Sequence, residues 1–434
     1  MNDALPTALR LYRVLSAAAT PLTPLLLARR LARGKEIRAR LAERRGEPSA
    51  ARPPGALVWV HGASVGEILS VLPLIERLSA RNIGVLVTSG TVTSSGVAEQ
   101  RLPPGVIHQF VPLDAPRFVR RFIAHWQPGL ALFVESDLWP NLMLETARRG
   151  VPLILVNGRL SEASYERWRR LPDSIASLLR RLDLCLARSP LDGARLVELG
   201  APRVITTGNL KLDAPAPPAD ARALADLRAA IGNRPVIAAA STHAGEETAM
   251  IEAHRRLRAN FAHLLTVIAP RHPERGPGIA EAASAAGLAV ALRSRRQLPD
   301  AATDIYVADT VGELGLIYRL APVVFIGGSL VPHGGQNPIE AAKLGAAILH
   351  GVHVQNFAEL YADLDTAHGA ELVVDADRLT ASLGALMAHP EARARLAEAA
   401  RATVEAQSGA LERTLQSLEP YLTQLQLAAQ PRHA

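Results

Sequence analysis

Residues 323–340 read VVFIGGSLVPHGGQNPIE, and this stretch decides the fold class. The apolar run Val323–Ile326 is typical of a buried strand. Asn337 is a good N-cap, Pro338 suits the first position of a helix, and Glu340 lies three residues after the cap. Paired glycines let backbone N–H groups approach an anion closely, and a helix N-terminus adds a favourable dipole. The stretch therefore predicts an α/β fold with a phosphate site; the alternative is a glycine-rich surface turn with an ordinary capping box.

Short apolar runs and helical stretches alternate along the chain, which predicts βα repetition and mainly parallel sheets. Strands are expected at 56–61, 85–88, 130–134, 153–156, 184–187, 204–207, 236–240, 264–269, 288–292, 305–308, 323–326 and 347–349. A proline-rich segment, 214–219, separates two series of strands. We therefore expect two doubly wound, Rossmann-like domains, with a ligand cleft between them at the carboxyl ends of the strands.

Three segments follow from this organisation. They are a basic and apolar segment at 1–48, a first Rossmann-like domain at 49–213, and a second at 214–434 that includes the C-terminal helices. At 434 residues the chain is long enough for two domains with sizeable cores. It has a single cysteine, Cys185, so an internal disulfide is excluded. The cysteine content therefore does not indicate an oxidising compartment.

Positive charge is concentrated at the N-terminus. Residues 1–48 hold ten lysines and arginines against four acids, which supplies +6 of the formal net charge of +7. The rest of the chain is close to neutral, so the high isoelectric point does not indicate a nucleic-acid partner. Aromatic residues, on which single-stranded nucleic acid stacks, are also few in the sequence.

An uncharged run, Val14 to Ala28, lies inside this basic segment. It is short for a membrane span, and Pro21 and Pro24 interrupt it. Arginines follow it closely, which is unusual for a cleaved secretory signal. We therefore expect a retained membrane-surface element whose basic flank faces anionic lipid. The alternative is an amphipathic helix pair packed on the body of the protein.

Polar segments follow five of the predicted strands, where side chains from adjacent parallel strands converge. They are HGASVGE (61–67), ESDLWPN (135–141), STHAGEE (241–247), PRHPER (270–275) and DTVGEL (309–314). Each alone is weak evidence, because caps and turns use the same residue types. Together they predict a site at the strand ends, and none of these five segments contains a His/Asp ligand cluster or a D-x-D pattern for a metal.

Taken with NGRLS (157–161), GNLKLD (208–213) and GGSLVPHGGQNPIEAA (327–342), these segments resemble the 3-deoxy-D-manno-octulosonic acid (Kdo) transferase family. The resemblance extends from about Leu9 to the C-terminal helix. Ser136 and Asp137 stand where the family usually has threonine and glutamate, and Gly158 where it has alanine. Gln336 stands where histidine is usual, which puts in doubt only a role that needs a protonatable imidazole.

The resemblance implies a GT-B glycosyltransferase at the cytoplasmic face of a Gram-negative inner membrane. It implies CMP-Kdo as the donor and a lipid A precursor, lipid IVA, as the acceptor in lipopolysaccharide biosynthesis. The family inverts the anomeric centre and needs neither a metal nor a cofactor. The residues agree with this expectation, because backbone N–H groups, a helix terminus and arginine can hold a leaving phosphate without a cation.

Residue roles follow from the matched segments. Glu67 is the expected general base, because inversion needs one base on the side of the attacking hydroxyl. Arg271 is expected to neutralise phosphate or the Kdo carboxylate. Glu135 is placed on the acceptor side, and Lys211 near the donor carboxylate. Glu340 is expected to accept hydrogen bonds from the ribose hydroxyls. The donor phosphate is assigned to the glycine-rich loop and its polar groups: Gly327, Gly328, Ser329 and Asn337.

Structural alternatives stand beside these assignments. Ser64 and Glu67 have capping-box spacing, and Glu340 could be only a capping partner. Arg271 could form an ion pair with Glu274. Two other functional classes also remain, since one fold hosts many chemistries. The first is another GT-B transferase or a nucleotide-sugar epimerase, independent of a lipid acceptor; the second is a membrane-attached protein that binds a sugar nucleotide without turnover.

Overall fold

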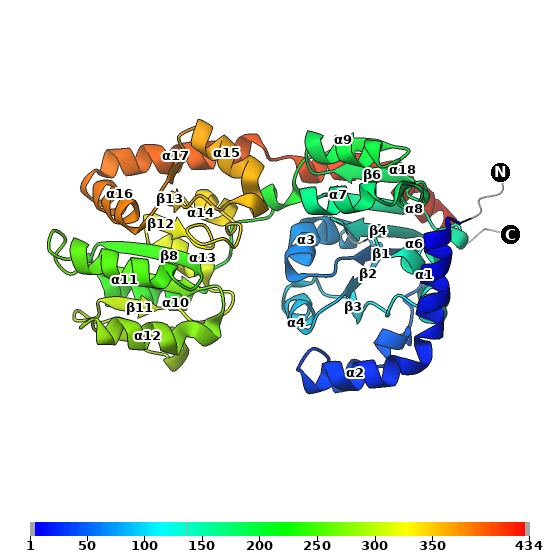
Figure 1. The fold of residues 1–434 in the computed structure, drawn as a ribbon, viewed down its shortest axis with the longest axis horizontal. Helices are drawn as coiled ribbons and strands as arrows, with labels where there is room; N and C mark the ends of the chain where they lie inside the picture. The colour runs from blue at the N-terminus through cyan, green and yellow to red at the C-terminus, as the bar shows by residue number, and fades with distance from the viewer. Residues whose placement is uncertain (1–4, 137, 430–434) are drawn as a thin grey trace. The chain divides into compact units, whose positions relative to one another are not determined.

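The structure is a computed structural model that describes residues 5–136 and 138–429 of the chain. The chain divides into two compact units, residues 1–214 with 407–434, and residues 215–406. Each unit contains one seven-stranded sheet, and Figure 1 shows helices on both faces of each sheet. All strand pairs are parallel. This confirms the predicted pair of doubly wound, Rossmann-like domains.

The first unit has the strand order β3-β2-β1-β4-β5-β6-β7. Its strands are β1 (Leu57–His61), β2 (Gly84–Ser89), β3 (Ile107–Phe110), β4 (Leu130–Val134), β5 (Leu153–Gly158), β6 (Leu184–Ala187) and β7 (Val204–Thr206). Its helices are α1 (Thr7–Ala18), α2 (Thr23–Ala32), α3 (Val65–Ser79), α4 (Val92–Arg101), α5 (Pro116–Trp126), α6 (Pro140–Arg148), α7 (Glu162–Arg169), α8 (Pro172–Leu179), α9 (Pro190–Glu198) and α18 (Ala410–Ala429). Alternate residues of β1 point to opposite faces, so Trp59 packs in the core with α5 and α6, and Val60 in the core with α3 and α18.

The second unit has the strand order β10-β11-β9-β8-β12-β13-β14. Its strands are β8 (Val236–Thr242), β9 (Leu265–Pro270), β10 (Val290–Leu292), β11 (Ile305–Val307), β12 (Val323–Ile326), β13 (Ala347–His350) and β14 (Ala370–Leu372). Its helices are α10 (Ala221–Ile231), α11 (Glu246–Leu257), α12 (Gly276–Ala285), α13 (Leu314–Leu320), α14 (Ile339–Lys343), α15 (Ala358–Thr366), α16 (Ala376–Ala388) and α17 (Pro390–Ala406). The strands β3 and β14, one in each unit, are the two that the sequence did not predict.

The C-terminal helix α18 belongs to the first unit, which corrects the expectation that 214–434 forms one domain. Its buried Leu418 and Leu422 join the core beneath α3. The carboxylate of Asp213 accepts hydrogen bonds from the N–H groups of Gly409, at 2.7 Å, and of Leu411 at the start of the helix. The sequence shows that a helix has an apolar face but not which sheet that face covers. The C-terminal helix was therefore assigned to the wrong domain.

The N-terminal segment forms α1 and α2, separated by a short 3-10 turn at Thr20–Leu22. Within the described residues, no single helix is both long and apolar enough to cross a membrane. Helix α1 and residues Thr20–Ala32 meet those criteria of length and composition only as a pair, and the pair is bent by 42°.

Candidate functional site

In each sheet the chain adds strands on one side of the first strand and then continues on its other side, and doubly wound folds bind their ligands at this switch point. In the first unit this point lies between β1 and β4, and in the second between β8 and β12. The predicted residues lie at these strand ends. Glu67 follows β1 and Glu135 follows β4, whereas Gly327–Ser329 follow β12 and Arg271 follows β9, the neighbour of β8.

Glu67 lies in the first turn of α3 and is half-buried. Its Oε2 atom accepts a hydrogen bond from the Ala63 N–H at 2.6 Å, and its Oε1 atom accepts one from the Ser64 hydroxyl at 2.8 Å. The Ser64 Oγ in turn accepts from the Glu67 N–H at 3.3 Å. The Ser64 half of the predicted capping box is therefore present, whereas the Glu67 carboxylate accepts from the Ala63 N–H. These contacts hold the carboxylate in a fixed position at a helix N-terminus.

His61, at the end of β1, is buried beside this carboxylate. Burial lowers the pKa of His61 to about 4, although the charge of Glu67 acts in the opposite direction. The Nδ1 atom of His61 lies 2.9 Å from the Thr88 hydroxyl oxygen. The imidazole is therefore neutral at neutral pH.

Glu135 and Lys211, which the sequence assigned to separate substrates, form one ion pair. The Lys211 Nζ lies 2.6 Å from the Glu135 Oε1, with 20% and 11% of the two side chains exposed. The backbone of Glu135 has a φ of 59°, a conformation that is uncommon outside glycine and that clusters at functional sites. The ammonium therefore already holds the Glu135 carboxylate within the first unit.

Asn157, at the end of β5, was not predicted as a site residue. Its Oδ1 atom accepts a hydrogen bond from the Leu210 N–H at 3.1 Å, which fixes the 3-10 turn that carries Lys211. Its φ is 55°, and its buried Nδ2 atom has no hydrogen-bond partner among the described residues. Its position in the sequence could have indicated a site residue, because Asn157 is the first residue of the NGRLS segment and directly follows a predicted strand.

The glycine-rich loop of the second unit already binds a carboxylate of the chain itself. The side chain of Glu246, in the first turn of α11, accepts hydrogen bonds from four backbone N–H groups. Its Oε2 atom accepts from His243 at 2.8 Å and Gly328 at 2.7 Å. Its Oε1 atom accepts from Ser329 at 2.9 Å and Leu330 at 3.0 Å. These N–H groups are an anion site, as predicted from the glycines, but the anion is internal.

The N–H groups of Gly328 and Ser329 are therefore already engaged by Glu246, and the assignment of the donor phosphate to Gly327, Gly328 and Ser329 stays a prediction. The Ser329 hydroxyl donates to the Ile326 carbonyl at 2.5 Å and accepts from the Gly351 N–H at 2.8 Å, and the residue is fully buried. The Gly327 N–H donates to the Ala240 carbonyl at 2.8 Å. A Cβ at Gly327 would lie 2.6 Å from the Ser241 carbonyl oxygen, so glycine is needed there for close strand packing.

Asn337 and Glu340 lie at the start of α14, which spans five residues. The Asn337 Oδ1 accepts from the Ile339 N–H at 3.0 Å, and the Asn337 amide donates weakly to Glu340 at 3.5 Å. The Asn337 side chain thus accepts from the first N–H of the helix, but the N-cap position is taken by Pro338, so the predicted cap is wrong by one residue. The contact of Glu340 with ribose stays a prediction.

Arg271 is exposed, and within the described ranges its guanidinium forms no ion pair. The expected alternative partner, Glu274, instead lies 3.8 Å from the Nδ1 atom of His272. A cation without a partner at the end of a strand is available for an anionic ligand.

Three histidines gather beside Arg271. The rings of His243 and His333 stack at 4.1 Å with an angle of 18° between planes, and His272 lies 5.9 Å from His243, edge to face. Burial lowers the pKa of His243 to about 4, assisted by His333, His272 and the nearby arginines. The neutral His243 Nε2 can accept from the Gln336 amide at 3.2 Å, so glutamine at 336 serves this contact without titrating. The sequence showed His333 only as part of the glycine segment.

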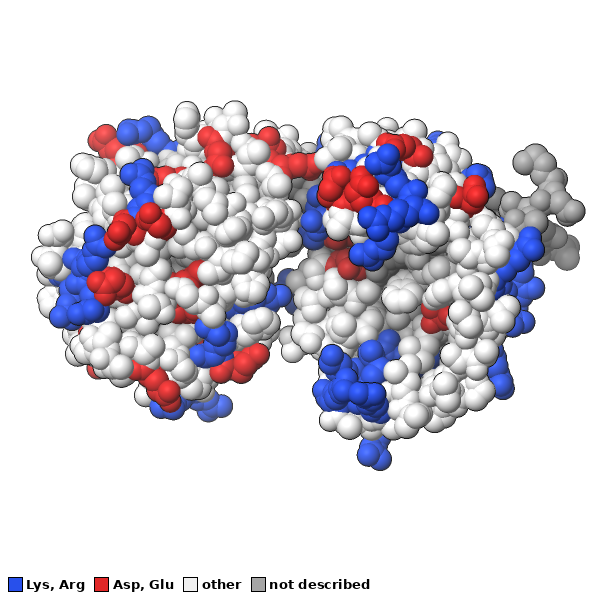
Figure 2. Space-filling view, in the orientation of Figure 1, with Lys and Arg blue, Asp and Glu red and all other residues white. Residues whose placement is uncertain are grey.

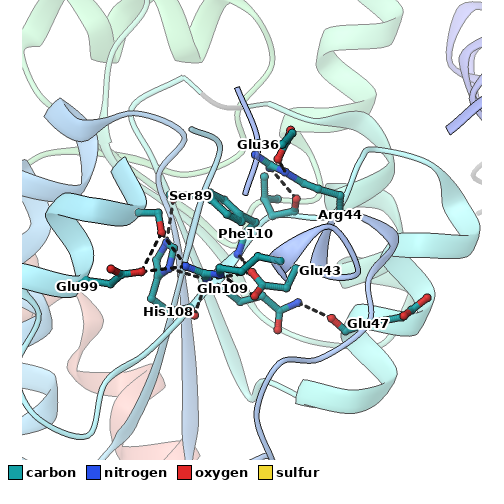
Figure 3. A network of polar contacts seen from close by, with 12 residues as sticks. Glu36, Glu43, Arg44, Glu47, Ser89, Glu99, His108, Gln109 and Phe110 are labelled. Carbon is teal, nitrogen blue, oxygen red and sulfur yellow. Dashed lines mark hydrogen bonds and ion pairs between the residues drawn. The ribbon is translucent and has the colours of Figure 1, made fainter. Parts of the chain in front are cut away.

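The N-terminal arginines are only partly available to a membrane. Arg40 forms a bidentate ion pair with Glu43 at 2.8 and 3.0 Å, and Arg44 pairs with Glu36 at 2.9 Å. The two guanidinium groups lie over the ring of Phe110, at 4.5 and 4.4 Å from its centroid. Figure 3 shows Glu36, Arg44 and Phe110 within this network. These contacts anchor the segment after α2 to the edge strand β3, and the charges of Arg40 and Arg44 are paired with carboxylates there.

A second group of cations is exposed. Four of them, at the end of α2 and just after it, form no ion pair in the described part of the chain: Arg29, Arg33, Lys35 and Arg38. Figure 2 shows basic side chains gathered over this end of α2. The same helix exposes apolar side chains, Leu25 by 72% and Leu26 by 47%. This combination is typical of an interfacial amphipathic helix.

No cluster of three or more His, Cys, Asp or Glu side chains that could hold a metal ion occurs in residues 5–136 or 138–429. Asp137, which stands where the family usually has glutamate, lies outside the described residues.

Comparisons with known proteins agree with the sequence resemblance. Residues 39–214 match the family described as 3-deoxy-D-manno-octulosonic-acid transferase. The chain is 35% identical to the 3-deoxy-D-manno-octulosonic acid transferase of Haemophilus influenzae, over 89% of this chain and 92% of that one. It is 38% identical to the enzyme of the same name from Bordetella pertussis, over 85% and 88%. A glycosyltransferase from Rickettsia africae, 12% identical, shares the fold with a TM-score of 0.59 over 85% of this chain and 99% of that one.

Proposed function

Because the chain belongs to the Kdo transferase family, we propose that it moves Kdo from CMP-Kdo to lipid IVA in lipopolysaccharide biosynthesis, with inversion and without a metal or cofactor. The observation that carries the proposal is sequence identity to a Kdo transferase across nearly the whole chain. The carboxylate of Glu67, in one of the matched segments, is also fixed at a topological switch point. The acidic residues and the basic cluster lie at the strand ends where such folds bind substrates.

Glu67 acts as the general base in this proposal. An acceptor hydroxyl attacks the anomeric carbon of Kdo, the bond from that carbon to the CMP phosphate oxygen breaks, and CMP leaves as an anion. The hydroxyl proton passes to the Glu67 carboxylate. Glu135 is a poorer candidate for the base, because the Lys211 ammonium lies 2.6 Å from it. The Glu135–Lys211 pair can instead contact substrate hydroxyls and the donor carboxylate.

The departing CMP phosphate is assigned to side chains rather than to the glycine loop. Arg271 supplies a fixed charge, and His272 and His333 are exposed imidazoles that can donate N–H groups. The internal carboxylate of Glu246 holds the loop, so the surface offered to the donor is preorganised before binding. No step in this arrangement requires a divalent cation.

Arg271→Ala should weaken CMP binding by about tenfold to a hundredfold, because a charge-assisted phosphate contact contributes about 1.5–3 kcal/mol. Titration calorimetry with CMP measures the change. Arg222→Ala, which removes an exposed arginine on α10, is the matched control and should leave the affinity unchanged. Equal affinities for the two variants would remove Arg271 from the donor site.

The membrane surface is proposed to be the cytoplasmic side of the inner membrane, contacted by the exposed cations and leucines of α2. Arg29→Gln combined with Arg33→Gln should weaken binding to anionic vesicles by about 30-fold, since each basic residue near such a surface contributes about 1 kcal/mol. Vesicle sedimentation measures the partition. The control pair Arg222→Gln and Arg228→Gln carries the same charge change on α10, and equal loss in both variants would contradict a specific surface.

The proposed reaction is tested by the release of CMP from CMP-Kdo with lipid IVA present, with the acceptor omitted, and with a chelator added. Release should depend on the acceptor and should not change with the chelator. Release without any acceptor would indicate a hydrolase or another class of sugar-nucleotide enzyme. Loss of release on chelation, restored by a divalent ion, would contradict the metal-free mechanism.

A further inference from the structure

An apolar pocket lies in the first unit between α1, α7, α8 and the loop that follows β4. Its volume is about 440 Å³, within the range of small-molecule sites. The side chains that line it include Leu9, Tyr12, Leu138, Trp139, Trp168 and Leu171. Trp139 is 41% exposed, although indole rings contribute a large apolar surface when they are covered. We call this site the α1–α7 pocket.

The apolar lining of the α1–α7 pocket continues along α1. Ala8 and Tyr12 line the pocket, and Leu15 follows them on the same face of the helix at the next i+3 position. Leu15 is 59% exposed, and Leu11 on the adjoining face is exposed as well. The apolar lining of the pocket therefore continues into the exposed leucines of α1.

Positive charge borders the same pocket. Arg167 lines it, and Arg170 and Arg180 line an adjoining polar pocket that shares Ala8, Leu171 and Ser174 with it. These three arginines are exposed and form no ion pair over the ranges that the structure describes. One acid, Asp173, lines the adjoining pocket beside them. An apolar cavity next to an excess of unpaired cations complements an anionic molecule with hydrocarbon chains.

We propose that the α1–α7 pocket holds an acyl chain of the lipid acceptor, with the acceptor's phosphate beside Arg167 and Arg170. The loop that lines the pocket begins at Ser136, directly after Glu135, so an acyl chain here places the head group near the candidate site. This inference rests on the proposed function, because it takes the acceptor to be an acylated, phosphorylated sugar. It adds to that function the residues that hold the acyl chain of the acceptor.

Filling the pocket tests the inference. Ala8→Phe adds an aromatic ring at the lining, and Ala17→Phe adds the same ring at an exposed position of α1 outside the pocket. With lipid IVA, Ala8→Phe should raise KM about tenfold, the equivalent of roughly two lost buried methylenes, and Ala17→Phe should not. With the fully deacylated acceptor, both variants should match the wild type. An equal effect of Ala8→Phe on both acceptors, or on neither, would overturn the inference.

Tryptophan fluorescence gives a measurement independent of turnover. Trp59 and Trp126 are fully buried in the core, whereas Trp139 and Trp168 line the pocket. A dibrominated fatty acid below its micelle concentration should quench the wild type saturably, and quenching should weaken about tenfold in Ala8→Phe but not in Ala17→Phe. Absence of saturable quenching, or equal quenching in both variants, would overturn the pocket. If no acceptor were glycosylated at all, the proposed function would fail while this measurement still decided whether the pocket takes an acyl chain.

Discussion

Glu67→Gln should give a folded protein that binds CMP but has lost about 10²–10⁴-fold in turnover, the usual contribution of a general base. Glutamine keeps an oxygen that can accept from the Ala63 N–H or the Ser64 hydroxyl, the two groups that now hold the carboxylate. It cannot take a proton. Rates of CMP release at saturating substrates, with CMP affinity measured in parallel, give the comparison.

The matched control removes the cap and keeps the carboxylate. Ser64→Ala loses the hydroxyl that accepts from the Glu67 N–H and donates to Glu67 Oε1, which should cost about 1 kcal/mol of stability. Its turnover should stay much closer to the wild type than that of Glu67→Gln. Near-normal turnover in Glu67→Gln would assign Glu67 to capping alone, and the base role would pass to Glu135 or Asp137.

Glu246→Ala should lower the free energy of unfolding by about 3 kcal/mol or more, because it leaves the N–H groups of His243, Gly328, Ser329 and Leu330 without their acceptor. Formate is small enough to occupy the vacated site and carries the same charged group. Urea unfolding in the presence of formate should therefore recover much of the lost stability, with little effect on the wild type.

The neighbouring Glu247 supplies the control for this rescue. It is also buried, but its carboxylate contacts side chains, the Arg275 guanidinium at 3.1 Å and the Thr242 hydroxyl at 3.2 Å. Glu247→Ala should destabilise the protein without rescue by formate, because no ring of backbone N–H groups remains to bind the anion. Equal rescue of both variants, or of neither, would contradict the internal-anion interpretation of the loop.

Most strands were predictable because parallel sheets buried on both faces produce continuous apolar runs. Runs such as Leu130–Val134 and Val323–Ile326 appear as strands with the expected bounds. The edge strand β3 has the sequence IHQF, in which His108 and Gln109 interrupt the apolar pattern, and β14 spans only three residues. Neither provides the periodic signal on which sequence interpretation depends.

The site was predictable in position but not in pairing. Strand ends in a parallel sheet converge, so Glu67, Glu135 and Arg271 could be placed at the strand ends from sequence. The contact between Glu135 and Lys211 joins residues 76 positions apart in the chain, and no local pattern encodes it. Likewise, the paired glycines predicted an anion site, but only the fold shows that the Glu246 carboxylate occupies it.

The most direct test of Kdo transfer is the mass of the lipid after incubation of the full-length chain with CMP-Kdo and lipid IVA. The account predicts that lipid IVA is converted to species heavier by one or more whole Kdo residues, and that Glu67→Gln leaves its mass almost unchanged under the same conditions. Lipid IVA that stays unmodified after incubation with the folded wild-type protein, or a mass increase that does not correspond to Kdo, would contradict the account.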